Sequence, residues 1–556
     1  MLKLFRNTFF TLLVLLLLLL AGAQIVYLTL GLAPPKVENA LSSNDPTTES
    51  GIRFLNGNWY FQNNYGLWEA YLAGKPYERG IVFGKLAERQ IQEQEGHFVA
   101  QIRRMIPSEW FLDTLKYGVA WFNRDLPTNV SEELKLELFG ISQSFSPEYE
   151  FIGSNYDRIL NYHAAHDIGH ALQDLSIVGC TSFASWNAAS ADSSLIIGRN
   201  FDFYMGDDFA KDKIILFMRP DSGYAFASIT WAGFMGVVSG MNEHGLTVTL
   251  NAAKSSIPTG SKTPISILAR EILQYARTID EAYQIAASRE TFVSESILIG
   301  SAIDEKAAII EKAPDGIDIY FPDSDNLVCA NHYQSERFRN SRENIENIKN
   351  SDSNYRFQRM NQLLSRTDSL TPVSTAEILR NQKGLDDAEL GMGNPKAINQ
   401  LLAHHAVIFQ PEKRLMWVSV NPFQLGEFLC YDLNAIFSET YEKPNQKGIY
   451  IDSLTIEKDA FLSSEKYNDF LLYKKLKNRL FDEVALGKDI EWNSEVEQKF
   501  ISSNPNSYIS YMMLGDHYFE SENHVMAKSF YEKSLTLEVS SESEREHIEK
   551  NLEKCR

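Results

Sequence analysis

An α+β fold is predicted by two features of the sequence, a central region of short strand-like runs and a C-terminal region of helical character. The strand-like runs are bounded by turns and lie at residues 194–197, 213–218, 225–231, 246–250, 296–299 and 307–311. A helical stretch at 265–287 interrupts them, and another at 85–106 precedes them. Runs of strands followed by runs of helices favour a layered α+β fold over alternating βαβ units.

The first 33 residues predict a segment directed to a membrane. Lys3 and Arg6 precede an apolar run at 9–32, which is long enough to cross a bilayer because about 20 residues suffice. Ala-Gly-Ala at 21–23 also resembles a signal-peptidase site, so a cleaved secretory signal is the alternative to a retained anchor. Either reading leaves the positive residues inside. We therefore expect the body in the cell envelope, membrane-anchored or secreted, on the extracytoplasmic side.

Three further regions follow the leader. Residues 34–52 are rich in Pro, Ser, Asn and Thr and are expected to be a linker, and 53–455 form the body. Residues 456–556 are expected to be a helical tail with one tetratricopeptide-like (TPR-like) hairpin near 508–538. The small and aromatic residues that suit such a hairpin are Leu514, Gly515, Tyr518, Ala527, Tyr531 and Ser534. The tail is either a surface for a protein partner or a cap on the body, and a single repeat favours the cap.

Composition excludes several classes of protein. The 556 residues are 44% hydrophobic with a net charge of −20, and no stripe of Lys and Arg appears. Binding to nucleic acid needs such a positive face, so no nucleic-acid partner is expected. Four scattered cysteines supply neither a disulfide framework nor CxxC zinc knuckles.

Cys180 is the residue best suited to catalysis. It follows Gly179 in the segment Gly-Cys-Thr-Ser, and glycine lacks the Cβ that would keep the thiol from the preceding carbonyl. Cleavage between Gly179 and Cys180 would create an α-amine of pKa about 8, which can accept the thiol proton. We therefore expect autocleavage at this bond, with nucleophile and base on one residue. A small buried apolar side chain is the alternative role of a lone cysteine.

Charged and amide side chains farther along the chain fit the same chemistry. Arg199 could favour the thiolate of Cys180, and Asp202 could orient the new α-amine. Asn251 ends a strand-like run, and Asn331 follows another, so either amide could donate to an oxyanion. A surface ion pair and two turn formers are the alternative roles.

Taken in order, four segments resemble one family. They are Gly-Cys-Thr-Ser from 179, Gly-Arg-Asn-Phe-Asp from 198, Asn-Glu-His-Gly-Leu from 242 and Asn-His from 331. The chain resembles, over roughly residues 65–430, the acyl-coenzyme A:6-aminopenicillanic-acid acyltransferases. More distantly it resembles choloylglycine hydrolases and penicillin V acylases, which are also N-terminal-nucleophile (Ntn) hydrolases. The resemblance implies a four-layer αββα sandwich made of an upstream fragment, 53–179, and a second fragment, 180–455.

The resemblance also implies a site and an activity. It makes Cys180 the nucleophile, with Arg199 and Asp202 beside it and Asn251 and Asn331 near the oxyanion. A later arginine assists the choloylglycine branch, and the residue here that could match it is Arg359. The implied reaction cleaves or forms an amide bond of a small-molecule substrate through an acyl-cysteine, by hydrolysis or by acyl transfer. No cofactor or metal is expected, although acyl-coenzyme A could be the acyl donor. The expected anchor and 12% aromatic residues suggest a lipid-like acyl chain.

Two other classes of protein remain as alternatives. A papain-like cysteine protease would use His332 or His170 as base, but the sequence lacks the Cys-Gly-x-Cys-Trp surroundings of that class. An inactive envelope scaffold would bind a partner through the tail, but it would not need the full set of candidate site residues. His163, His166 and His170 could share a helix face and hold a metal, yet no carboxylate or thiolate pattern completes a site, so a polar face near the pocket is favoured. His404 and His405 carry no spacing signal.

Overall fold

The computed structural model describes residues 22, 32–37, 44–106, 108–171, 179–254, 260–438, 444, 447–486 and 492–555. The predicted leader at 1–33 lies almost wholly outside these residues. No helix within the described ranges has the length and apolarity that a membrane span requires. The first strand, Thr47–Glu49, falls inside the stretch expected to be a linker, so sheet pairing starts earlier than composition suggested.

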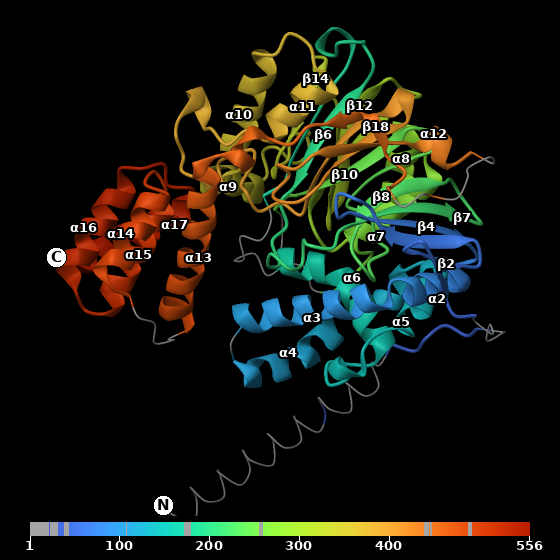
Figure 1. Ribbon diagram of the computed structural model, residues 1–556, viewed down its shortest axis with the longest axis horizontal. Helices are drawn as coiled ribbons and strands as arrows, with labels where there is room; N and C mark the ends of the chain where they lie inside the picture. Colours follow the sequence, from blue (N-terminus) through green and yellow to red (C-terminus); the bar gives the residue numbers. More distant parts are fainter. Residues whose placement is uncertain are drawn as a thin grey trace, which may run out of the picture.

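Two sheets form the centre of the molecule, and the α+β prediction is confirmed (Figure 1). Within the described residues the larger sheet has 11 strands and is antiparallel except where β4 meets β7. Its strands in spatial order are β1 (Thr47–Glu49), β2 (Ile52–Leu55), β3 (Asn58–Gln62), β4 (Trp68–Gly74), β7 (Ile214–Pro220), β8 (Phe226–Thr230), β9 (Ser239–Asn242), β10 (Leu246–Ala252), β11 (Glu295–Ser301), β12 (Lys306–Ala313) and β13 (Gly316–Tyr320).

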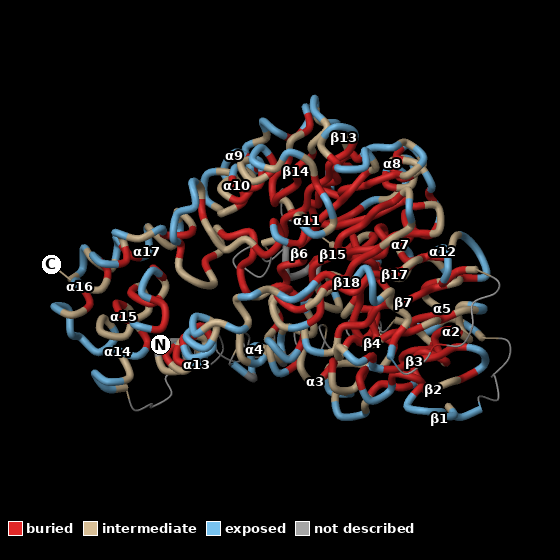
Figure 2. Tube along the Cα trace, turned by 45° about the horizontal axis from the view of Figure 1, so that its top comes forward, coloured by how far each residue is buried: buried red, intermediate tan, exposed pale blue. Residues whose placement is uncertain are grey.

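The smaller sheet has seven strands among the described residues, all paired antiparallel. Their spatial order is β14 (Asn326–Cys329), β5 (Thr181–Ser185), β6 (Ile196–Phe201), β15 (His405–Gln410), β16 (Leu415–Ser419), β17 (Phe428–Asp432) and β18 (Ile451–Ile456). Apolar side chains of both sheets, such as Phe217 and Phe409, form one core between them. The buried residues concentrate in these strands (Figure 2).

Helices cover the outer faces of both sheets, so the layers run helix, sheet, sheet, helix. One core joins the larger sheet to α2 (Pro76–Leu86), α3 (Glu88–Met105), α5 (Glu132–Ser142), α6 (Asn155–Ala171), α7 (Ile265–Tyr275) and α8 (Ile279–Ser288), with α4 (Glu109–Phe122) at its margin. Another core joins the smaller sheet to α10 (Ser353–Ser365) and α11 (Pro372–Leu379). Helix α9 (Arg342–Asn350) lies between β14 and α10, and the short helix α12 (Leu433–Ile436) lies between β17 and β18.

Both helical stretches expected from the sequence are split. The 85–106 stretch breaks at Ala87, whose ψ of 18° ends α2 before α3 begins. The 265–287 stretch breaks before Thr278, whose side chain caps α8 by accepting from the Glu281 amide. Apolar spacing continues across each break, which is why periodicity alone did not reveal it. Gly80 of α2 lies against the Glu137 carbonyl of α5, an approach that a Cβ would block.

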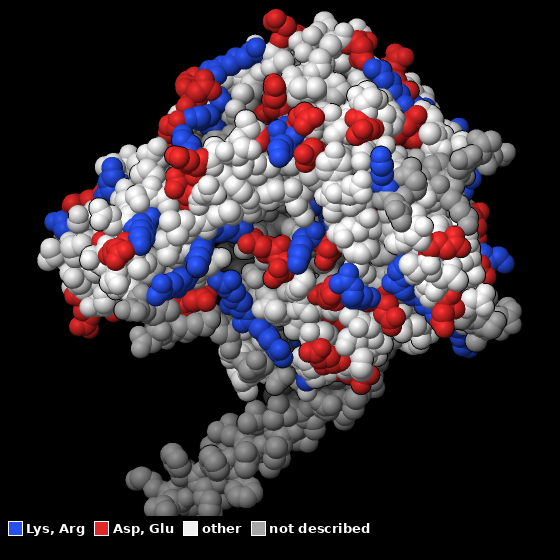
Figure 3. Space-filling model, viewed as in Figure 1, with Lys and Arg blue, Asp and Glu red and all other residues white. Residues whose placement is uncertain are grey.

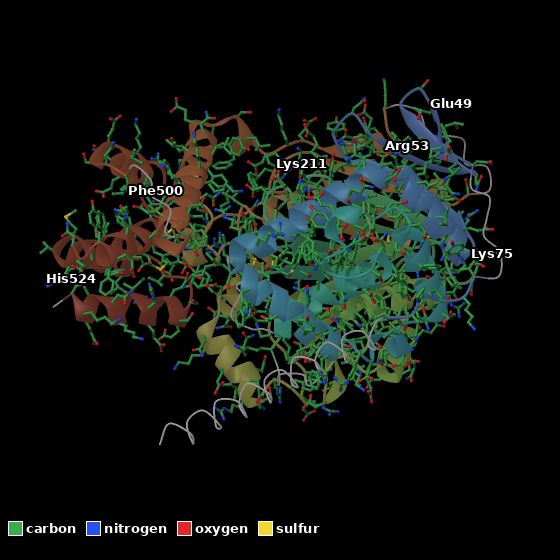
Figure 4. All side chains as sticks on the ribbon, turned by 90° about the horizontal axis from the view of Figure 1, so that it is seen from below. Glu49, Arg53, Lys75, Lys211, Phe500 and His524 are labelled. Carbon is green, nitrogen blue, oxygen red and sulfur yellow. The ribbon has the colours of Figure 1, made fainter. Side chains whose placement is uncertain are left out.

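The C-terminal tail consists of helices. They are α13 (Glu465–Leu486), α14 (Ser494–Ser503), α15 (Tyr508–Glu520), α16 (His524–Leu535) and α17 (Glu542–Lys554). Figure 4 shows Phe500 and His524 of this tail at the opposite end of the molecule from Glu49 and Arg53. Helices α15 and α16 form a hairpin in which a Cβ on Gly515 would meet the Tyr531 ring at 2.5 Å. The hairpin lies where the sequence placed it, while its membership of the TPR class stays a prediction.

We expect Gly515→Ala to destabilise the tail, because the added methyl group overpacks a buried contact and such changes cost about 1–3 kcal/mol. Gly118→Ala in α4 is the matched control, since a Cβ there meets nothing within 4 Å. Alanine in that helix should be neutral or stabilise by up to about 1 kcal/mol. Calorimetry with limited proteolysis of the tail compares the two. Equal unfolding temperatures for both variants would contradict the close contact between α15 and α16.

Candidate active site

Cys180 lies directly before β5 and is buried, with 1% of its surface exposed. Strand β5 pairs with β6, and this register places Ser182 opposite Arg199. The ladder continues past β5, because the Gly179 amide donates to the Asp202 carbonyl at 3.0 Å. The hairpin therefore brings together the two segments that the sequence singled out, Gly-Cys-Thr-Ser and Gly-Arg-Asn-Phe-Asp.

Arg199 is buried and points at the sulfur. Its Nη2 lies 3.7 Å from Cys180 Sγ, and its guanidinium also donates to Ser239 Oγ and the Leu250 carbonyl. The guanidinium stacks over the Phe201 ring, 4.4 Å from its centroid. A guanidinium held this firmly can stabilise a thiolate without moving.

Burial sets the protonation of the site. It raises the pKa of the Cys180 thiol to about 11, an effect that nearby Arg199 opposes. It also raises the pKa of Asp202 to about 7, against the opposing charges of Arg356 and Arg199. The thiol is thus neutral in the uncleaved chain, while Asp202 titrates near neutrality. Asp202 Oδ1 is a buried oxygen for which the described residues supply no hydrogen-bond donor.

Two carbonyls fix the backbone around the Gly179–Cys180 peptide bond, that of Gly179 within the bond and that of Cys180 after it. Gln400 Nε2 donates to the Gly179 carbonyl at 2.8 Å, and Arg356 Nη1 donates to the Cys180 carbonyl at 2.7 Å. Arg356 also donates to Thr181 Oγ1 at 2.8 Å. The bond expected to be cleaved is therefore fixed in the structure by side chains from two distant segments.

The two asparagines lie near the cysteine but already have partners. Asn251 accepts from Ser182 Oγ at 2.7 Å and donates to the Cys329 carbonyl at 3.1 Å. Asn331 accepts from Arg356 at 2.8 Å and donates to the Ala252 carbonyl at 2.8 Å. Each amide carries a second N–H, so an oxyanion role is compatible with these contacts.

The structure places Arg356, rather than Arg359, beside the cysteine. Arg359 is buried, but its guanidinium forms an ion pair with Asp387 at 2.6 Å and donates to Asn381 and Gln362. Both arginines belong to α10 and lie about one turn apart on the same side of the helix, so Arg356 reaches the Cys180 carbonyl while Arg359 lies farther along, beside Asp387. A role for Arg359 in the reaction stays a prediction, and the sequence did not single out Arg356 because spacing alone does not show which turn of the helix lies beside Cys180.

The described candidate histidines form hydrogen bonds with groups other than the Cys180 thiol. His163 contacts the Ile159 carbonyl through Nδ1, and its Nε2 accepts from the Met235 amide, both at 2.8 Å, which leaves neither nitrogen for a metal. The side chains of His166 and His170 lie outside the described residues. His332 contacts Ser353 Oγ at 2.7 Å, and no described histidine hydrogen-bonds to Cys180, as a papain-like site would require. Within the described chain no cluster of three metal-ligating residues occurs.

One pair of histidines that the sequence did not flag belongs to the surroundings of Arg199. His405 Nε2 lies 2.9 Å from Ser239 Oγ, and its Nδ1 lies 2.9 Å from His404 Nδ1. Burial lowers the pKa of both histidines well below the usual range, so they support Ser239 as neutral rings.

The family model for acyl-coenzyme A:6-aminopenicillanic acid acyl-transferase matches residues 186–424. The resemblance to that family is confirmed. The matched region includes Arg199, Asp202, Arg356 and Gln400 and begins after Cys180.

Individual relatives are distant. An uncharacterized protein of Archaeoglobus fulgidus is 25% identical over 302 residues, 48% of this chain and 50% of that protein. N-acylethanolamine-hydrolyzing acid amidase of Caenorhabditis elegans is 30% identical over 204 residues, 35% of this chain and 53% of that protein. The chain thus spans about half the length of the curated relatives it matches. A solved mutant of conjugated bile acid hydrolase from Clostridium perfringens is 13% identical over 48% of this chain and 94% of that one, with a TM-score of 0.32, too low to support a conclusion.

We predict that Asn251→Ala lowers turnover by about 100- to 1000-fold, because an oxyanion donor acts after the tetrahedral species begins to form. Apparent substrate affinity should change little. Asn242→Ala is the control, since Asn242 is equally buried but donates to the Leu273 and Ala276 carbonyls on α7. Thermal unfolding and turnover are measured on both. A lower melting temperature with normal turnover in Asn251→Ala would make its role structural.

Proposed function

We propose that this chain is an autoproteolytic Ntn amidohydrolase or acyltransferase whose nucleophile is Cys180. The observation that carries the proposal is the set of contacts around Cys180. Side-chain donors hydrogen-bond to the carbonyls of Gly179 and Cys180, and the Arg199 guanidinium contacts the thiol. A cysteine that only filled the core would need none of these contacts. The match to the acyltransferase family and the layered sheets support an Ntn-hydrolase fold.

Maturation proceeds in two steps that together hydrolyse one peptide bond. Cys180 Sγ attacks the Gly179 carbonyl carbon, the C–N bond to Cys180 breaks, and the thiol proton ends on the departing nitrogen. The product is a thioester between Gly179 and the Cys180 side chain, together with a free α-amine. Water then cleaves the thioester, which yields the Gly179 carboxylate and restores the thiol.

The upstream fragment stays attached after cleavage. Its strand β4 pairs with β7 of the second fragment across seven residues, inside the larger sheet. Ion pairs add to this contact: buried Arg79 lies 3.3 Å from the exposed Asp221, and Glu137 lies 3.0 Å from Arg270, both of these being buried. Separating the fragments would expose a sheet edge and unpaired buried charges, both of which are costly.

Turnover then uses the new N-terminus. The Cys180 α-amine, of pKa about 8 in a free chain, takes the thiol proton, and Asp202 Oδ1 offers an acceptor to the resulting ammonium. Arg199 stabilises the thiolate that attacks the substrate amide. An acyl-cysteine forms as the α-ammonium gives its proton to the leaving amine, and water or an acceptor amine then resolves the intermediate. Acyl-coenzyme A as a donor remains a prediction.

The substrate class we propose is a small N-acyl amide with a lipid-like acyl chain. Aromatic side chains lie close to the site: the Phe201 ring stacks under Arg199, and the Phe203 ring stacks on Phe201 at 5.6 Å and on Trp231 at 6.4 Å. The C. elegans relative is named for hydrolysis of N-acylethanolamines, which belong to this chemical class. We also propose that the body is extracytoplasmic and anchored in a membrane, where it would meet such lipids.

Self-cleavage is the first test. We expect purified protein to give two fragments on denaturing electrophoresis, and N-terminal sequencing to start one of them at Cys180. Cys180→Ala should remain one chain, and Cys180→Ser should cleave slowly because a hydroxyl is the weaker nucleophile. Cys430→Ala, another buried cysteine, is the matched control and should cleave normally. Full-length protein that hydrolyses amides without cleavage would refute the proposal.

The pH dependence of cleavage follows from Asp202. Its carboxyl has a pKa of about 7 in the uncleaved chain, and only its deprotonated form can take the thiol proton and pass it to the departing Cys180 nitrogen. The cleavage rate should therefore rise with pH and level off above about 7. Asp202→Asn should cleave slowly at every pH and lose this rise. An unchanged pH profile in that variant, measured by quenched time courses, would remove Asp202 from the mechanism.

A further inference from the structure

The segment that carries Gln400 connects two parts of the molecule. We call residues 389–401 the Gln400 loop; it runs between α11 and β15 and is well buried at its C-terminal end. On the side of the body it is fixed by Asn200, which donates to the Ile398 carbonyl at 2.9 Å, and by Asn399, which donates to the Phe423 carbonyl at 3.2 Å. The loop therefore belongs to the site even though no motif marks it.

Gln400 contacts the bond that is cleaved in the proposed function. Its Nε2 donates to the Gly179 carbonyl at 2.8 Å and lies 3.5 Å from Asp202 Oδ2. A Cβ at position 179 would meet the Gln400 amide at 2.6 Å, so glycine is what allows this close approach. When the thiol attacks, negative charge develops on that carbonyl oxygen, and a donor already in place stabilises it.

The helical tail holds the other end of the Gln400 loop. Asn504, between α14 and α15, accepts from the Met392 amide at 2.9 Å and donates to the Met392 carbonyl at 2.8 Å. Glu538 pairs with Lys396 at 2.6 Å, and its carbonyl accepts from Asn394 at 3.1 Å. Leu401, next to Gln400, packs into the same apolar core as Phe470 of α13.

A second contact of the tail reaches the helix that carries Arg356. Ser540, just before α17, donates to Asp352 Oδ2 at 2.7 Å. Asp352 is the N-cap residue of α10, and Arg356 follows one turn later. The tail thus touches both segments that donate to the carbonyls around the scissile bond.

From these contacts we infer that Gln400 is the oxyanion donor of self-cleavage and that the C-terminal tail positions it. This inference rests on the proposed self-cleavage at Gly179–Cys180. In the attack of Cys180 Sγ on the Gly179 carbonyl, Gln400 stabilises the oxyanion and exchanges no proton. The tail acts at a distance, as a brace on the Gln400 loop, and takes no part in the chemistry itself.

Replacement of Gln400 tests the donor. Gln400→Ala should slow self-cleavage by about 100-fold or more, the usual effect of losing an oxyanion donor. Gln410→Ala is the matched control: Gln410 is also 5% exposed, but it faces Asp192. Gln400→Glu can donate only while its carboxyl is protonated, so its rate relative to wild type should fall as pH rises. A merely structural role would not produce that dependence.

The outcomes separate the two proposals. Wild-type protein that never cleaves at Gly179–Cys180 would refute the proposed function. Cleavage in wild type together with wild-type rates in Gln400→Ala would refute only the role of Gln400. Slow cleavage in Gln400→Ala, with normal cleavage in Gln410→Ala and the falling pH ratio in Gln400→Glu, would support it.

Replacement of Asn504 tests the brace. Asn504→Ala removes both hydrogen bonds to Met392 and should slow cleavage by about 10-fold, since small displacements of a positioned group cost this much or more. Asn523→Ala is the control in the tail, because Asn523 caps α16 without touching the Gln400 loop. Equal cleavage rates in the two variants would refute positioning by the tail.

Exchange of the two charges of the Lys396–Glu538 ion pair is a second test of positioning by the tail. Lys396→Glu and Glu538→Lys should each slow cleavage several-fold, and the double variant should recover because the ion pair is restored with reversed sign. A tail that resists proteolysis in the two single variants shows that their slow cleavage does not come from unfolding. Absence of recovery in a double variant whose tail resists proteolysis would also count against the brace.

Discussion

Burial of charge around one peptide bond is the constraint on which the site depends. Arg199 and Arg356 are both buried. Burial also raises the pKa of the carboxyls that face them, that of Asp202 to about 7 and those of Glu295 and Asp352 in the same direction. Two buried cations facing carboxyls that burial holds back from ionising leave a surplus of positive potential, which costs free energy in the resting chain. In the proposed self-cleavage, a thiolate or a tetrahedral oxyanion would supply the missing negative charge. The resting site would then be arranged for a charge that exists only during reaction.

The layered sheets make that burial feasible. Cys180 lies directly before β5 and Arg199 lies on the adjacent strand β6 of the smaller sheet, while Ser239 and Leu250, which hold Arg199, belong to the larger sheet. The guanidinium therefore bridges the two sheets through its two Nη atoms, and its buried Nε has no hydrogen-bond partner among the described residues. Its partners are serine and backbone groups, so the cation keeps its charge for the sulfur. Charges of both signs lie on the outer face that Figure 3 shows, with several Lys and Arg side chains grouped near its middle.

Local segments could be predicted from the sequence, and distant contacts could not. Cys180 and Arg199 stand out because a hairpin joins their motifs, so sequence proximity becomes spatial proximity. Arg356 was not singled out beside Arg359, since the two lie one turn apart on the same side of α10 and only the folded structure shows which turn lies beside Cys180. Gln400 carried no signal at all: it lies in an irregular loop and reaches the site through packing of segments 221 residues apart. The α+β class followed from strand patterning, whereas helix breaks at Ala87 and before Thr278 depended on local backbone geometry and capping.

The helices of the tail could serve either as a partner-binding arm or as a cap on the body. As an isolated hairpin, α15 and α16 would suit a partner-binding arm, and that prediction is untested. Their surroundings favour a cap, because one apolar core contains Leu401 and Leu425 of the body together with Phe470 and Leu514 of the tail. Ion pairs from Arg104 to Asp482 and from Lys474 to Asp207 also tie α13 to α3 and to the segment between β6 and β7. Under the proposed self-cleavage, a tail held by these contacts and by the Gln400 loop would transmit its own unfolding to the Gly179–Cys180 bond. The tail would then take part in maturation, and any partner binding would use only the faces left outside these contacts.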